Sequence, residues 1–174
     1  MGLPEEAGGI LPHEAAFGLG FMSIAGFTGE RALPLRGEDV SNALIELFTV
    51  TIWGERDFLV VDMPPGIGEE LLDLTRLIGR VESVVVGTSS VVAARVVRRL
   101  LGLLLEMGAP VLGIIENMAS GPTVMDGVAG ELAVPFLGAV PFDPDLEKSL
   151  GTPERFVGSA FAQRLDRILA PALG

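Results

Sequence analysis

The chain has 174 residues and a formal net charge of −11, from 12 basic and 23 acidic side chains. This excess of acid repels phosphate backbones and argues against general nucleic-acid binding. The absence of cysteine excludes disulfides, thiolate metal sites and thiol nucleophiles. No apolar stretch reaches the roughly 18 residues that a membrane span needs, and the acidic start MGLPEEAGG has no basic leader. We therefore expect one cytoplasmic domain over residues 1–174, without membrane association.

Strand and helix patterns alternate along the chain. Apolar runs bounded by turn residues predict strands at Phe21–Ala25, Asp57–Met63, Val81–Gly87, Pro110–Glu116 and Phe136–Val140. Helical spacing and capping residues predict five helices. Two lie from Asp39 or Ser41 to Phe48 and over Glu69–Ile78, and a third runs from a cap within Thr88–Ser90 to Met107. A short fourth helix ends within Glu131–Ala133, and the fifth covers Ser159–Leu169. This order predicts an α/β fold with a mostly parallel sheet. The unbroken apolar run Phe58–Val61 predicts an interior strand, buried on both faces.

Ligands of parallel sheets bind beyond the carboxyl ends of the strands, so the polar residues found there are the first candidates. Asp62 ends the second predicted strand, and a carboxylate at such a position can bind magnesium through water. Gly66 lets the backbone approach a phosphate closely. An ordinary strand-to-turn transition explains the same pattern. A dinucleotide fingerprint is disfavoured, because Leu71 occupies the place of the third small residue.

Two further polar positions follow the last predicted strands. Asn117 follows the fourth, and its side chain carries both a donor and an acceptor that can read a base edge. The turn Pro141, Phe142, Asp143 follows the fifth, and its aromatic ring can flank a base. Turn chemistry explains each position equally well, because asparagine and proline are common turn residues.

Together these segments resemble one family. The run WGERDFLVVDMPPGIG resembles the W-G-x-x-D-x-L-hydrophobic-x-D-x-P-P-G-T-G-D signature of the Mrp/ApbC-type ATPases. These are iron–sulfur cluster carriers within the MinD/ParA group of P-loop NTPases. GLGFMSIA, LPLRGEDVSNAL, VLGIIENMAS and FLGAVPFDPDL resemble further family segments in the same order. The resemblance extends from Phe17 to Pro153.

The resemblance implies a fold, a cofactor and roles for individual residues. The implied fold is a three-layer sheet with helices on both faces, and the implied cofactors are ATP and Mg²⁺. Asp62 would be the Walker B-type acid near the metal, and Gly66 would belong to the switch that senses the terminal phosphate. Asn117 would contact the adenine, and the turn Pro141, Phe142, Asp143 would border it.

Three departures from the family pattern shape the expected function. No segment resembles the G-K-G-G-V-G-K-[ST] phosphate loop, and the one lysine, Lys148, lies in DLEKSL without a glycine loop. The C-x-x-C that cluster carriers place after E-N-M is replaced by ASGPTVMDG. The T-G-D after the prolines has become Ile67, Gly68, Glu69.

We therefore expect an incomplete P-loop NTPase-like domain that lacks its first strand, with an open sheet edge in its place. No catalytic residue and no iron–sulfur cluster are expected, and ATP with Mg²⁺ should bind weakly or only with a partner. The missing segment would come from elsewhere, either as a separate chain or because the sequence is a truncated reading. The expected assembly is a homo- or hetero-oligomer, such as a dimer, with a homologue that carries the phosphate loop. The alternative is a degenerate, non-enzymatic interaction module that pairs with an intact homologue.

Overall fold

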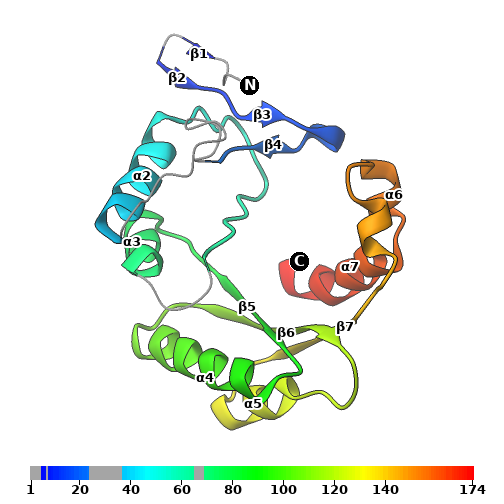
Figure 1. Cartoon of the computed structure of the whole chain (residues 1–174). Helices are drawn as coiled ribbons and strands as arrows, with labels where there is room; N and C mark the ends of the chain where they lie inside the picture. Colours follow the sequence, from blue (N-terminus) through cyan, green and yellow to red (C-terminus); the bar gives the residue numbers. More distant parts are fainter. Residues whose placement is uncertain (1–4, 7, 24–36, 65–68) are drawn as a thin grey trace. The chain divides into compact units, whose positions relative to one another are not determined.

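The computed structural model describes residues 5–6, 8–23, 37–64 and 69–174 (Figure 1). The chain forms two compact units, Met1–Gly79 and Arg80–Gly174. The organisation of 1–174 as a single domain stays a prediction. Among the described residues, no helix combines the length and the apolar character that a membrane crossing requires.

The first unit contains short hairpins and two helices. Its elements are β1 (Glu5–Glu6), β2 (Gly9–Ile10), β3 (His13–Glu14), η1 (Ala16–Gly18), β4 (Gly20–Phe21), α2 (Gly37–Val50) and α3 (Glu69–Leu77). Strands β1 and β2 pair antiparallel, as do β3 and β4, and α2 packs against α3. Both predicted helices are confirmed. Strand β4 contains the first residue of the strand predicted at Phe21–Ala25, whose last two residues lie outside the described ranges.

The prediction of a buried strand over Asp57–Met63 is wrong. Residues 58–64 have no regular secondary structure. The side chains of Phe58, Leu59 and Val60 are 63%, 46% and 89% exposed. A central strand needs a hydrogen-bonded neighbour on each side, and no strand of the described residues pairs with this run. Without a ladder, its apolar composition alone does not hold it in a sheet.

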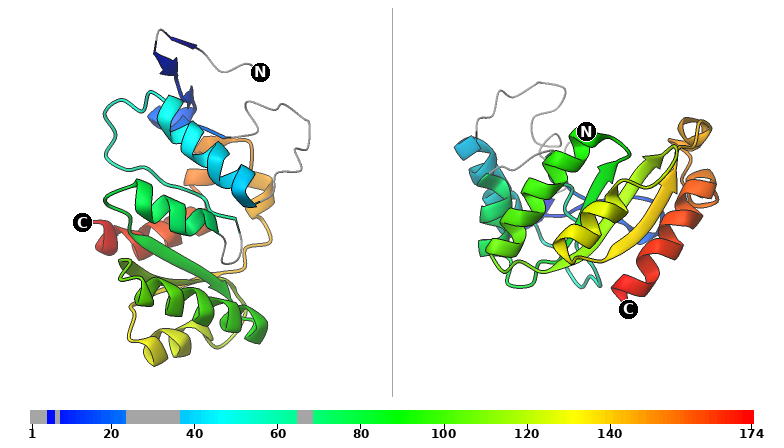
Figure 2. Two further views of the ribbon diagram at one scale, coloured as in Figure 1. Left: turned by 90° about the vertical axis from the view of Figure 1, so that its left-hand side faces the viewer. Right: turned by 90° about the horizontal axis from the view of Figure 1, so that it is seen from below.

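The second unit is an α/β layer structure. Its elements are β5 (Ser83–Thr88), α4 (Val91–Glu106), β6 (Val111–Ala119), α5 (Met125–Leu132), β7 (Phe136–Pro141), η2 (Leu146–Ser149), α6 (Pro153–Val157) and α7 (Ala160–Leu173). The three strands are parallel in the order β5-β6-β7. Helices α4 and α5 cover one face of this sheet and α7 covers the other (Figure 2). The predicted fold class and the strands and helices predicted for this unit are confirmed.

Helix α4 illustrates how local signals set the elements of this unit. Its N-cap is Ser90, whose hydroxyl accepts a hydrogen bond from the Val92 N–H at 3.2 Å. Buried residues recur at helical spacing along it: Ala94, Val97, Leu101 and Leu104. The chain leaves the helix at Gly108, whose φ of +67° suits a residue without Cβ. On the other face, Ile115 and Val140 of the sheet form a buried cluster with Ile168 of α7.

Candidate functional site

The predicted metal-facing acid belongs to the first unit. Asp62 is exposed and lies in the irregular segment that follows Val60. Gly66 lies outside the described residues. No group of three or more His, Cys, Asp or Glu side chains in the described ranges could hold a metal ion. A single carboxylate fits Mg²⁺ as one oxygen ligand, and that ion keeps several waters and takes further ligands from phosphates. Asp62 therefore fits the implied metal when a nucleotide supplies the remaining oxygens.

The remaining predicted site residues belong to the second unit and lie at the carboxyl ends of its strands. Asn117 is near the carboxyl end of β6, and Pro141 ends the neighbouring β7. Ala119 pairs with Pro141 across the two strands, and the Phe142 N–H donates to the Ala119 carbonyl at 3.2 Å. The structure thus brings Asn117 and the turn that begins at Pro141 together at the edge where α/β sheets bind ligands.

Local hydrogen bonds fix the two segments at this edge. The Asn117 Oδ1 accepts from the Met118 N–H at 2.9 Å, and the Asp143 Oδ1 accepts from the Asp145 N–H at 2.9 Å. The Asp143 bond, to the N–H two residues on, is the turn chemistry that aspartate supplies, whereas the Asn117 bond reaches only the next residue of β6. The Asp143 carboxylate therefore has a structural use in its turn, and Asn117 keeps its amide nitrogen to offer to a ligand.

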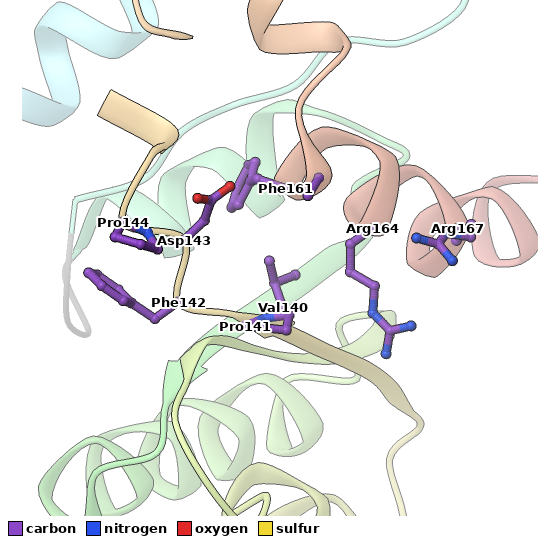
Figure 3. Close-up of a pocket in the computed structure, with 9 residues that line it drawn as sticks. Val140, Pro141, Phe142, Asp143, Pro144, Phe161, Arg164 and Arg167 are labelled. Atoms are coloured by element: carbon purple, nitrogen blue, oxygen red, sulfur yellow. The ribbon is translucent and has the colours of Figure 1, made fainter. Parts of the chain in front are cut away.

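A pocket of about 390 Å³ opens beside this turn. Its lining comes from the end of β7, from the turn that follows it and from α7: Val140, Pro141, Phe142, Asp143, Pro144, Ala160, Phe161, Arg164 and Arg167. Figure 3 shows Phe142 and Asp143 on one side of Val140, and the two arginines on the other. The walls are mostly apolar rings and aliphatic groups, which can flank a flat base.

Sequence reasoning missed the contribution of α7 to this pocket. Arg164 donates from Nε to the Ala139 carbonyl at 3.0 Å, which ties the helix to β7. The sequence offers one signal, because Ser159 caps the helix and sets Phe161 and Arg164 in its first turns. That the helix packs beside the turn at Pro141 depends on the tertiary structure.

Sequence reasoning also missed the role of Glu116. Its side chain is fully buried. Its carboxylate accepts hydrogen bonds from the Ser89 hydroxyl at 2.6 Å and from the Val124 and Met125 N–H groups, each at 2.7 Å. Burial pushes the pKa of Glu116 up, but the bonds from Met125, Ser89 and Val124 together lower the pKa below its ordinary value. The signal in the sequence is a charged residue at the end of an apolar strand.

Comparison with known proteins shows the family of the chain. The family described as ParA, NUBPL iron-transfer P-loop NTPase, matches residues 2–171. An iron–sulfur cluster carrier protein from Aquifex aeolicus is 34% identical over 156 residues, which are 80% of this chain and 43% of the relative. The carrier from Bacillus subtilis is 33% identical over 159 residues, 83% of this chain and 45% of the relative. The chain thus spans less than half the length of these two relatives.

Solved structures show the same fold. A nucleotide-binding protein from Archaeoglobus fulgidus, in complex with ADP, superposes with a TM-score of 0.72 and 22% identity, covering 93% of this chain and 68% of that one. The cell division protein MinD from Aquifex aeolicus superposes with a TM-score of 0.58 and 18% identity, covering 82% and 63%. The chain shares its fold with MinD and ParA proteins of known structure, and it belongs to the family described as ParA, NUBPL iron-transfer P-loop NTPase.

Proposed function

We propose that this chain contributes the base-binding edge and the magnesium-facing acid of an ATP site, within an assembly related to iron–sulfur cluster carriers. The observation that carries the proposal is the shared carboxyl end of β6 and β7: Asn117 lies two residues before Ala119, Ala119 pairs with Pro141, and the Pro141 turn lines a pocket of about 390 Å³. The relatives from Aquifex aeolicus and Bacillus subtilis are iron–sulfur cluster carrier proteins, which supports the link to cluster carriage. The chain has no cysteine, so the cluster would be cargo of another member of the assembly.

Each residue has one task in this proposal. The Asn117 amide offers a donor to a ring nitrogen of the base, and Pro141 with Phe142 offers apolar surface to the ring face. Asp62 would be the residue that holds a magnesium ion beside the phosphates. Bound Mg²⁺ neutralises phosphate charge and supplies the electrostatic part of phosphoryl transfer.

The phosphate half of the site is proposed to come from a homologue. A phosphate loop cradles the nucleotide with backbone N–H groups and reaches the β- and γ-phosphates with a lysine. The one lysine here, Lys148, forms an ion pair with Asp145 instead. The net charge of −11 opposes a triphosphate. The chain by itself is therefore expected to bind ATP weakly and not to hydrolyse it.

A second candidate function is a non-enzymatic interaction module that pairs with an intact homologue. The exposed apolar side chains of Phe58, Leu59 and Val60 favour it, since adjacent large apolar residues at a surface mark association sites. The two candidates differ in their need for Asp62. An ATP site with Mg²⁺ depends on that carboxylate, whereas pairing alone does not.

Calorimetry with Mg-ATP tests the proposal on the chain alone and after addition of a homologue that carries the phosphate loop. We expect weak or no binding alone and tight binding in the mixture. Asp62→Ala should weaken the binding of Mg-ATP by the mixture. Glu55→Ala removes an exposed acid from the same unit and should leave that binding unchanged. Micromolar binding by the chain alone would contradict the proposal. Equal binding by the mixture with and without Asp62→Ala would favour the interaction module.

A further inference from the structure

The end of β6 carries an irregularity beside Asn117. Across from β7, Glu116 pairs with Ala139 and Ala119 pairs with Pro141, so Asn117 and Met118 together face the single residue Val140. This two-against-one arrangement is a β-bulge, a feature that re-aims side chains next to binding sites. Met118 has a φ of +54°, in the left-handed region that side chains other than glycine seldom occupy. Such a conformation persists when the surrounding structure holds it.

The buried carboxylate of Glu116 holds this bulge from its near side. Its acceptor bonds reach Ser89, which follows β5, and the N–H groups of Val124 and Met125, which begin α5. The side chain of the residue just before Asn117 therefore ties the start of the bulge to the residue after β5 and to the beginning of α5. On the far side of the bulge, the Ala119 carbonyl accepts from the Phe142 N–H at 3.2 Å. A buried charge with three donors resists displacement, because losing a donor leaves it unsatisfied.

The bulge determines what Asn117 offers to a ligand. Because Oδ1 accepts from the Met118 N–H at 2.9 Å, the oxygen and nitrogen ends of the carboxamide are fixed. The fixed carboxamide can distinguish bases, because the second lone pair of Oδ1 can accept from a base donor while the amide nitrogen donates to the neighbouring acceptor. Adenine presents a donor at N6 next to an acceptor at N7, whereas guanine presents acceptors at both O6 and N7.

We propose that Glu116 is a positioning residue for base recognition: it holds the Asn117–Met118 bulge, and through it the orientation of the Asn117 carboxamide. The proposal rests on the proposed function, because it takes Asn117 as the base contact. The simpler role for Glu116 is that of a cap for α5, whose N-cap residue Val124 makes no side-chain capping bond. The two roles predict different responses at Met118.

Amide hydrogen exchange by NMR on the ligand-free chain separates these roles. The variants are Glu116→Gln, which keeps an acceptor but loses the charge, and Glu116→Leu, which removes the acceptor. The control is Glu131→Gln, an equal charge change on an exposed acid of α5. A positioning role predicts exchange at the Met118 N–H about tenfold faster or more in both Glu116 variants, with a shifted Asn117 side-chain amide signal. Faster exchange confined to Val124 and Met125 would overturn the proposal, and Glu116→Gln decides this even where Glu116→Leu does not fold.

Nucleotide selectivity supplies the second measurement, in the mixture with the homologue that carries the phosphate loop. Glu116→Gln should lower the preference for ATP over GTP by about fivefold or more, approaching the value for Asn117→Ala. An unchanged preference in Glu116→Gln, with a lowered one in Asn117→Ala, would overturn the positioning role. An unchanged preference in Asn117→Ala would show that the proposed base contact is wrong. The exchange measurement then still decides whether Glu116 holds the bulge.

Discussion

Arg98 of α4 and Glu131 of α5 form a two-bond ion pair, with Nε to Oε2 at 2.6 Å and Nη2 to Oε1 at 3.0 Å. Their side chains are 41% and 55% exposed, so water screens the attraction and the pair adds little stability. The hydrogen bond from Arg98 still lowers the pKa of Glu131. In the second unit, the fold thus lowers the pKa of the exposed carboxylate Glu131 and of the buried carboxylate Glu116. Of these two, the buried Glu116 should have the larger effect on how the stability of the unit changes in acid.

The first prediction concerns acid unfolding. The folded state lowers the pKa of Glu116 below its ordinary value of 4.5. The ionised carboxylate therefore contributes fully to the free energy of unfolding above pH 4.5, and this contribution is lost as the pH falls through the pKa of the folded state. At neutral pH, Glu116→Gln should lower the free energy of unfolding by about 1–3 kcal/mol. This gap to the natural chain should shrink as the pH falls below 4.5 and through the lowered pKa of the folded state. Urea unfolding at several pH values measures it.

The control for this prediction is Glu131→Gln, which removes the charge of the exposed carboxylate and leaves Glu116 unchanged. Its unfolding curves should stay close to those of the natural chain across the same pH range. Parallel pH profiles for the natural chain and Glu116→Gln would contradict the prediction.

The second prediction concerns two glycines of the same unit. Gly113 has a φ of +154°, and a Cβ there would lie 2.6 Å from the Pro135 carbonyl oxygen. Gly113→Ala should therefore cost at least about 1–3 kcal/mol, because backbone must move. Gly102 lies within α4 with nothing within 4 Å of an added Cβ, and Gly102→Ala should stabilise by about 0.5–1 kcal/mol. Thermal unfolding compares the stabilities of the two variants. Equal effects would contradict the prediction that only Gly113 lacks room for a Cβ.

The third prediction concerns the exposed apolar run. We expect the isolated chain to self-associate, since Val60 is 89% exposed between two other large apolar residues. Val60→Asp should lower the mean mass seen by light scattering at high concentration. Val157→Asp places the same charge on a residue of α6 that is 55% exposed, and it should leave the mass unchanged. A monodisperse monomer of the natural chain would contradict the expectation.

The fourth prediction concerns iron–sulfur clusters. Cluster irons are held chiefly by cysteine thiolates, and the chain has none. After anaerobic reconstitution and desalting, we expect no visible absorption band from a bound cluster. A relative that retains the C-x-x-C, taken through the same procedure, provides the positive control. A stoichiometric band in this chain would show that other residues ligate iron.

The sequence by itself determined the family, the α/β fold class and most elements of the second unit, because their signals are local. The cap at Ser90, the helical spacing up to Leu104 and the stop at Gly108 are written in consecutive residues. The predicted edge residues Asn117 and Pro141 follow from the same logic, since parallel strands end at one side of a sheet.

Tertiary structure decided what depends on neighbours distant in sequence. The run Phe58–Val61 has the composition of a buried strand, but a strand also needs ladder partners, and none of the described strands pairs with it. Glu116 looks in the sequence like the polar end of a strand. Its burial and its bonds to Ser89 and Met125 exist because β5, β6 and α5 converge there. Hydrogen bonding and burial between separate segments are properties of the assembled fold, which apolar periodicity does not encode.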